Sequence, residues 1–449
     1  MNPITNSLKF FSSTLFNILL AFIFFLIAGK FTNPAFVGQV AIIQLMETIS
    51  ITFFTLLPYN IITREISEKF TNKEDYKDII YTSLSYSILI SPLVLILLFF
   101  PSYLYLSIPY FILFVYTAYQ SSILSGLGKF TEISIGNILL VIFRWGLSII
   151  SVYYHSILLL IFFWTLGALI KAIYYQFFIP FKFRFDINIA KEIVKIGFPI
   201  YLSGIVSFIS SQGDRVITAF LLGSYYLGIY QLVALISTLP LLLLLNSFSS
   251  SLLPSSTHYY AKGIELHKMS SLTLRLLTLI SLPIAIIGFY ITPIFLQTFF
   301  PKYILGKEAL EILILSLTAI IPLQILSTFL ITLKKNYKIF IYIGTISALT
   351  VIIFSYLLIP IYNITGAAIS QLLNAIITSL LILYYSYKQN IIKLTKKEIY
   401  SIILIFLSFL SFINWYLTLI IILLLFKLFK IITKDDLKII DIFLPNYLK

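Results

Sequence analysis

The positive charges of this chain alternate with its hydrophobic segments. Of its 31 lysines and arginines, all but five fall in alternate gaps between apolar runs. Lys30, Lys302 and Lys307 lie in the other set of gaps, and Arg144 and Arg215 lie inside apolar runs. Membrane proteins keep their cation-rich loops in the cytoplasm. The alternation therefore predicts a multi-pass protein of the cell membrane, with both termini cytoplasmic.

Composition agrees with a chain whose solvent is the bilayer. Hydrophobic residues make up 60% of the chain and charged residues 11%, and the mean hydropathy is +1.02. A net charge of +14 in short loops indicates contact with anionic membrane lipids rather than nucleic acid. With no cysteine and three histidines, disulfides and a Cys/His zinc site have almost no ligands. We expect no cofactor and no metal.

The apolar runs predict an all-α fold with about fourteen transmembrane helices. Twelve of them form two six-helix lobes, residues 1–180 and 181–390, and residues 391–449 add a C-terminal helix pair and tail. Weak internal echoes, such as Val37-Gly38-Gln39 and Leu227-Gly228-Ile229, favour a pseudo-repeat of the lobes. The predicted spans are 8–28, 36–62, 79–100, 103–124, 133–154, 156–178, 196–222, 225–254, 271–296, 305–333, 339–360 and 364–387, then a stretch at 399–432 that is long enough for two short spans meeting at Asn414 and Trp415.

Charged residues inside these spans are the candidates for substrate binding, because each costs a few kcal/mol unless it faces a cavity or a partner. Arg144 and Glu47 lie near the middle of their spans, and Asp214 and Arg215 are adjacent in the seventh. The guanidinium of Arg144 is suited to phosphate groups. The alternative for Arg144 is a structural ion pair with Glu47 or Asp214.

Other cations lie closer to the ends of the spans. Lys171 is a further candidate for substrate contact, but its long side chain could instead extend to the membrane interface. The same interpretation applies to Arg64 and Arg275. Asp214 and Arg215 point about 100° apart on a helix, so they cannot both face one partner.

Enzyme signatures are missing from the sequence. It contains no G-x-S-x-G, H-E-x-x-H, P-loop or dinucleotide fingerprint. The predicted external loops are short, which disfavours a membrane glycan polymerase or ligase. We therefore do not expect an enzyme.

Several motifs resemble those of polysaccharide exporters in the MOP flippase superfamily, of the O-antigen flippase type. In that family an Asp-Arg pair precedes an apolar run, then Leu-Gly and Gly-x-Tyr, and a Gly-Leu-Gly-Lys/Arg turn follows the fourth span. The chain departs from the family at Gln39, where an apolar or aromatic residue is usual. The matching runs are Gln212-Gly213-Asp214-Arg215-Val216-Ile217, Leu222-Gly223, Leu227-Gly228-Ile229-Tyr230, Leu124-Ser125-Gly126-Leu127-Gly128-Lys129-Phe130 and Gly197-Phe198-Pro199.

The resemblance implies two lobes around a cavity that opens alternately to each side and moves a polyprenyl-pyrophosphate-linked oligosaccharide outward. The substrate would be the main partner, beside glycan-assembly proteins. Such cavities tend to be cationic, yet here Arg144 and Arg215 offset Glu47 and Asp214, which leaves Lys171 or shallower arginines to supply net positive charge. The alternatives are a drug or metabolite exporter of the same superfamily, and a glycan polymerase or ligase.

Overall fold

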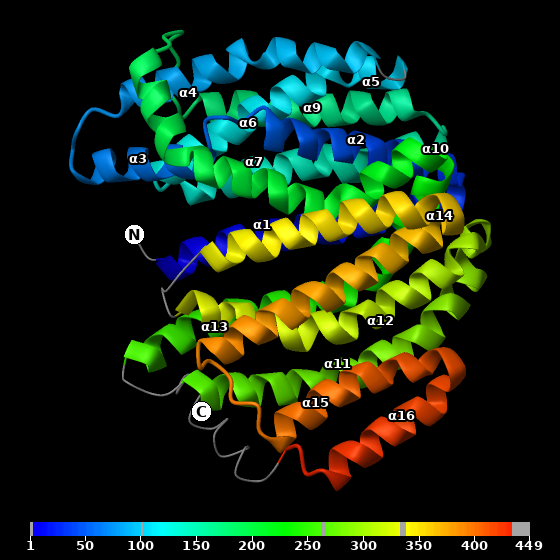
Figure 1. Ribbon diagram of the computed structural model, residues 1–449. Coiled ribbons are helices and arrows are strands. Elements are labelled where there is room, and N and C mark those ends of the chain that lie inside the picture. The colour runs from blue at the N-terminus through cyan, green and yellow to red at the C-terminus, as the bar shows by residue number, and fades with distance from the viewer. Residues whose placement is uncertain (1–2, 100–101, 262–265, 333–337, 433–449) are drawn as a thin grey trace. The chain divides into compact units, whose positions relative to one another are not determined.

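The computed structural model describes residues 3–99, 102–261, 266–332 and 338–432, and every regular element in these ranges is a helix (Figure 1). The predicted all-α class is therefore confirmed. The elements are α1 (Pro3–Phe31), α2 (Pro34–Phe53), α3 (Tyr59–Thr71), α4 (Lys77–Leu89), η1 (Ser91–Phe99), α5 (Ser102–Leu106), α6 (Ile108–Gly126), α7 (Phe130–Val141), η2 (Ile142–Leu147), α8 (Ile149–Tyr153), α9 (Ile157–Gln176), α10 (Ile187–Ala261), α11 (Leu266–Phe299), η3 (Pro301–Gly306), α12 (Lys307–Gln324), α13 (Leu326–Thr332), α14 (Lys338–Lys388), α15 (Lys396–Leu407), η4 (Ser408–Leu410) and α16 (Ser411–Leu428).

The described residues contain 10 helical stretches that are long and apolar enough to cross a membrane. This makes the chain a multi-pass membrane protein, while the exact number of fourteen spans stays a prediction. Two of these stretches have 51 residues each, enough for two crossings apiece. Non-helical backbone interrupts α10 at Gly223, α14 at Asn363 and α16 at Asn414. Each break falls where the sequence predicted one span to end and the next to begin.

The chain divides into two compact units. The first comprises residues 1–212 and 223–228, and the second comprises residues 213–222 and 229–449. The lobe boundaries at residues 180 and 390 stay predictions.

In the first unit, α6 packs against α3 and α9, and α1 packs against α7. Local sequence determines where α2 and α9 begin. Asn33 caps α2, its side chain accepting a hydrogen bond from the Phe36 amide at 2.9 Å, and Pro34 follows at the first helical position. Ser156 caps α9 by accepting from the Leu159 amide. Both α2 and α9 contact α6, and all three helices carry site residues.

Two glycine motifs of the sequence have a steric basis in the first unit. Gly128 has a φ of 71°, which favours glycine, in the turn between α6 and α7. A Cβ on Gly38 would lie 1.7 Å from the Ser224 carbonyl oxygen, and one on Gly228 would lie 1.8 Å from that of Pro34. The two glycines of the proposed repeat therefore let the start of α2 and residues 224–228 meet through their backbones.

In the second unit, α12 packs between α11 and α14, and α11 also contacts α15 and α16 (Figure 1). A continuous apolar core joins these helices; among its members are Leu274, Leu282, Phe329, Leu404 and Ile422. The C-terminal helix pair is thus packed onto the second unit through α11.

Candidate functional site

Arg144 lies on a short π-helix, η2, that connects α7 to α8. A π-turn inserts one extra residue into a helix and is frequent at functional sites. Arg144 and the next residue, Trp145, are both buried, with 8% and 2% of their surface exposed. The wider turn allows two consecutive side chains to point into the protein.

Arg144 forms a buried ion pair with Glu47 of α2. Its Nη2 donates to Glu47 Oε2 at 2.7 Å, and Tyr110 Oη of α6 donates to the same oxygen, also at 2.7 Å. Desolvation of such a pair is offset only by close geometry and additional hydrogen bonds. Of the two partners that the sequence allowed for Arg144, the structure therefore places Glu47 beside it.

Aromatic rings enclose the guanidinium group of Arg144. Its Cζ lies 4.7 Å from the ring centroids of both Trp145 and Trp164, and 5.8 Å from that of Phe114. Cation–π attraction is strongest in such desolvated surroundings. Trp145 Nε1 also donates to Asn17 Oδ1 of α1 at 2.9 Å. Arg144 Nε, in contrast, is buried without a hydrogen-bond partner in the described part of the chain.

Lys171 of α9 does not extend to the membrane interface, so that expectation was wrong. Only 6% of its surface is exposed, because it belongs to the inward stripe of α9, which also holds Trp164, Gly167, Ala168 and Tyr175. Its Nζ lies 5.4 Å from the centroid of the Tyr175 ring. Among the described residues, no acceptor is hydrogen-bonded to this amine.

A small cavity of ≈ 200 Å³ lies beside Arg144 and Lys171, and we call it the Lys171 cavity. Its described lining includes two cations, two amides and two hydroxyls, and no carboxylate lies among these residues. It is formed by Ser13, Thr14, Asn17, Phe114, Asn137, Leu140, Val141, Arg144 and Lys171.

Asp214 and Arg215 belong to the second unit. Tyr230 Oη donates to Asp214 Oδ2 at 2.5 Å, while Oδ1 is buried without a hydrogen-bond partner in the described part of the chain. Asp214 is 2% exposed and Arg215 is half-buried, as expected for neighbours that point in different directions. The structure thus brings Glu47, Arg144 and Lys171 into one site and places the Asp-Arg pair in the other unit.

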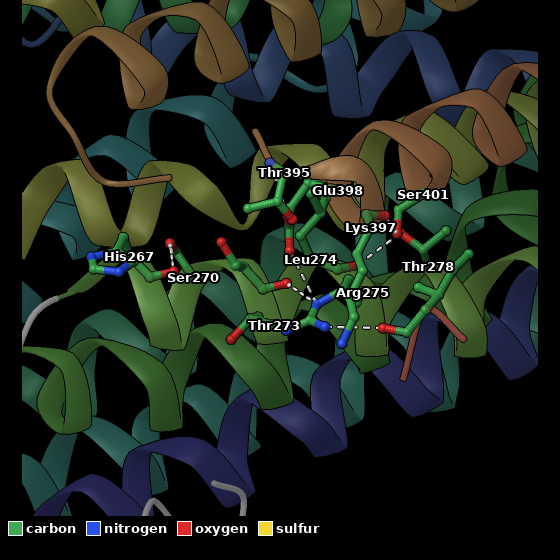
Figure 2. A network of polar contacts seen from close by, with 12 residues as sticks. His267, Ser270, Thr273, Leu274, Arg275, Thr278, Thr395, Lys397, Glu398 and Ser401 are labelled. Atoms are coloured by element: carbon green, nitrogen blue, oxygen red, sulfur yellow. Dashed lines mark hydrogen bonds and ion pairs between the residues drawn. The ribbon is translucent and has the colours of Figure 1, made fainter. Parts of the chain in front are cut away.

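Arg275 of α11 is also buried, which corrects the expectation that it extends to the interface. Figure 2 shows its contacts. Nε lies 3.2 Å from Glu398 Oε1 of α15, and Nη1 donates to the Ile431 carbonyl at 3.0 Å. Glu398 Oε2 accepts from the Thr395 amide, as part of a capping box at the start of α15, and also from the Thr395 hydroxyl. This pair joins α11 to both ends of the C-terminal helix pair. Arg64, by contrast, is exposed.

Sequence reasoning missed several members of these sites. Tyr110, Trp145, Trp164 and Phe114 looked like ordinary apolar residues of spans. Glu398 was also missed, although the Thr395-x-x-Glu398 spacing is a recognisable capping-box signal. The inward position of Lys171 was detectable from the small and aromatic residues three and four positions away. In the described part of the chain, no three His, Cys, Asp or Glu side chains gather as metal ligands.

Comparison with solved structures defines the class of fold. The structure of a lipid II flippase, MurJ in an inward closed conformation, matches with a TM-score of 0.68 and 18% identity over 95% of this chain and 99% of the other. A MOP superfamily transporter from Pyrococcus furiosus matches with a TM-score of 0.52 and 12% identity, covering 87% and 96%. The chain therefore shares the fold of these two membrane proteins.

Sequence comparison narrows the resemblance. Residues 102–303 match the model of a family described as "Polysaccharide biosynthesis protein". The capsular polysaccharide biosynthesis protein CapF of Staphylococcus aureus is 29% identical over 231 residues, which cover 49% of this chain and 57% of CapF. The chain thus spans little more than half the length of this relative. These matches confirm the predicted resemblance to proteins of polysaccharide biosynthesis, and the solved structures confirm the predicted similarity of fold to a MOP superfamily transporter.

Proposed function

We propose that this protein is a flippase that translocates a polyprenyl-(pyro)phosphate-linked oligosaccharide from the cytoplasmic to the outer face of the cell membrane. The main support for the proposal is that the residues matching the polysaccharide biosynthesis family include those of the candidate site. Residues 102–303 include Phe114, Asn137, Arg144 and Lys171, which line the Lys171 cavity. The part of the chain that resembles polysaccharide biosynthesis proteins therefore contributes the buried cations of the first unit.

The physical requirements of a flippase agree with this chain. Translocation needs no covalent chemistry, only a polar path for the head group and two conformations of similar free energy. We assign substrate contact to Arg144, Lys171 and Glu47 in the first unit and to Asp214 and Arg215 in the second. Transport would proceed by alternating access of two lobes, residues 1–180 and 181–390, with the termini in the cytoplasm.

A drug or metabolite exporter is the alternative within the same fold. Exporters that couple to ions commonly use carboxylates in the first lobe. Glu47 is the buried carboxylate available there, but its Oε2 accepts from both Arg144 and Tyr110. An engaged carboxylate is a poor ion-coupling group, so this arrangement favours the flippase.

Deletion of the gene tests the proposed function. We expect loss of surface glycan and accumulation of complete lipid-linked oligosaccharides on the cytoplasmic face, detected by their resistance to an impermeant glycosidase in intact cells. A plasmid carrying the wild-type gene should restore export. Single units stranded on the outer face would indicate a polymerase instead, and unchanged surface glycan with altered drug tolerance would indicate an exporter.

A further inference from the structure

We propose that the Lys171 cavity binds one phosphate group, with Lys171 as its ligand and Arg144, held by Glu47, as a positioning residue. The inference deepens the proposed function and rests on it only for the source of the phosphate. It divides the three charged residues of the first unit into two roles that sequence reasoning did not separate.

The charges of the site leave one cation uncompensated. Arg144 and Glu47 neutralise each other through their ion pair at 2.7 Å. Lys171 is 6% exposed, and its amine has no hydrogen-bond acceptor among the described residues. A buried ammonium without an anionic contact is costly. An anion that enters the cavity and accepts hydrogen bonds from this amine would remove that cost.

The remaining polar groups of the cavity also suit an anion. Trp145 Nε1 can only donate, so its bond fixes Asn17 Oδ1 as the acceptor and leaves the NH₂ group of Asn17 as a donor. The Tyr175 hydroxyl likewise lies on the Oδ1 side of Asn137, at 3.5 Å. Both amides line the cavity. A phosphate group accepts hydrogen bonds from amines and amides alike, whereas a metal cation would meet no carboxylate in the lining.

The size of the cavity limits the ligand. Its volume is ≈ 200 Å³, while pockets for drug-sized molecules have roughly 300–1,000 Å³. A phosphate or pyrophosphate group is small enough for this space, and an oligosaccharide is not. The phosphate could come from the lipid-linked substrate, with its sugar and lipid chain outside the cavity, or from free inorganic phosphate.

Tryptophan fluorescence can report binding directly. The chain has three tryptophans, and Trp145 and Trp164 both stack on Arg144. In a Trp415→Phe background, these two are the only tryptophans of the chain, and excitation at wavelengths that tyrosine does not absorb, in nanodiscs with a tryptophan-free scaffold protein, isolates their emission. The full-length protein would be purified in nanodiscs of neutral phosphatidylcholine and titrated with inorganic phosphate, inorganic pyrophosphate and farnesyl pyrophosphate.

We expect saturable fluorescence changes with at least one of these probes. Lys171→Gln should weaken its binding at least tenfold, while Lys195→Gln, which removes the same charge from an exposed position on α10, should leave it unchanged. Glu47→Gln should strengthen binding severalfold because it removes the negative charge that compensates Arg144. The opposite signs of these two effects keep the test decisive even if one variant folds poorly.

The outcomes separate the proposal from the proposed function. Binding of farnesyl pyrophosphate alone would identify the lipid-linked substrate as the source, and binding of inorganic phosphate as well would support a site for free phosphate. If no probe binds the wild-type protein, or if Lys171→Gln binds as tightly, the assignment is wrong. Trapped lipid-linked oligosaccharide in the deletion strain would then still support the flippase. If the purified protein shows binding that depends on Lys171 but the deletion strain makes normal surface glycan, the binding site is supported and the flippase is rejected.

Discussion

Among the described residues, each unit contains one buried arginine–glutamate pair, and the two pairs differ in their surroundings. In the second unit, Arg275 is bound by Glu398 and by the backbone carbonyls of Ser271 and Ile431, and Glu398 is bound by Thr395. In the first unit, Arg144 Nε of the Arg144–Glu47 pair has no hydrogen-bond partner in the described part of the chain. The pair lies beside a cavity and the Lys171 amine, to which no described acceptor is hydrogen-bonded.

The difference indicates which pair holds the structure together and which can take a ligand. A fully satisfied buried network is rigid and fixes one arrangement of its helices. The Arg275 network joins α11 to the C-terminal helix pair, and in the described part of the chain none of its buried polar atoms lacks a hydrogen-bond partner. The Arg144 pair is incomplete as it stands, and an incomplete polar site in a membrane helix bundle points to function.

The largest expected effect on stability comes from breaking the Arg275–Glu398 pair. Arg275→Ala leaves Glu398 buried without its cation, so we expect the free energy of unfolding to fall by about 3–5 kcal/mol. The measurement is unfolding of the purified protein by sodium dodecyl sulfate in mixed micelles. The double variant Arg275→Leu, Glu398→Leu should recover most of this loss, since no buried charge remains. A single variant that is as stable as the wild type would mean that the pair does not anchor the C-terminal helices.

Arg144→Ala should affect glycan export more strongly than the stability of the protein. Glu47 keeps its bond from Tyr110 and the electrostatic attraction of the nearby Lys171, so the free energy of unfolding should fall by only about 1–3 kcal/mol. Export of glycan should nevertheless be abolished, and Arg144→Lys should preserve part of it because the charge remains without the planar fork. Surface glycan per unit of folded protein in the complemented deletion strain is the readout. Normal export by the alanine variant would remove Arg144 from the site.

Much of the fold was predictable because the bilayer restricts the possible structures. The alternation of cations and apolar runs predicted a polytopic helical protein, and the breaks at Gly223, Asn363 and Asn414 lie where predicted spans meet. Gly223 has a φ of 78°, a conformation for which the sequence offers a direct signal. Strong local preferences thus coincided with the tertiary structure at these positions.

The site was less predictable because hydropathy does not say which side of a helix faces lipid. The sequence left Lys171 and Arg275 between substrate contact and extension to the interface, and depth alone could not decide between them, although both lie on inward helix faces. The π-turn at Arg144 and the pairing of Glu47 with Tyr110, 63 positions away, depend on tertiary packing. Residue type identified the charged residues as candidates, but the structure was needed to show which of them lie together.

A smaller effect is expected when one hydroxyl donor to each glutamate is removed. Tyr110→Phe removes a hydrogen bond to Glu47, and Thr395→Val removes the hydroxyl that bonds Glu398. Each change should lower the free energy of unfolding by about 1–2 kcal/mol. Only Tyr110→Phe should also change phosphate binding in the fluorescence titration. An equal effect of Thr395→Val on that titration would contradict the division between an anchoring pair and a binding pair.

The smallest effect is expected for a pair that is exposed. Arg184 Nη1 lies 2.8 Å from Asp78 Oδ1, about as close as Arg144 lies to Glu47, but the two side chains are 54% and 41% exposed. Water and salt screen such a pair, so Arg184→Gln should change the free energy of unfolding by about 0.2–1 kcal/mol, and less in 1 M salt than in 0.05 M. Distance is matched between the two pairs, so burial is the variable that this comparison isolates. If Arg184→Gln were as destabilising as Arg144→Ala, ion pairing itself rather than burial would determine the stabilising effect, and the contrast between the buried pairs would lose its physical basis.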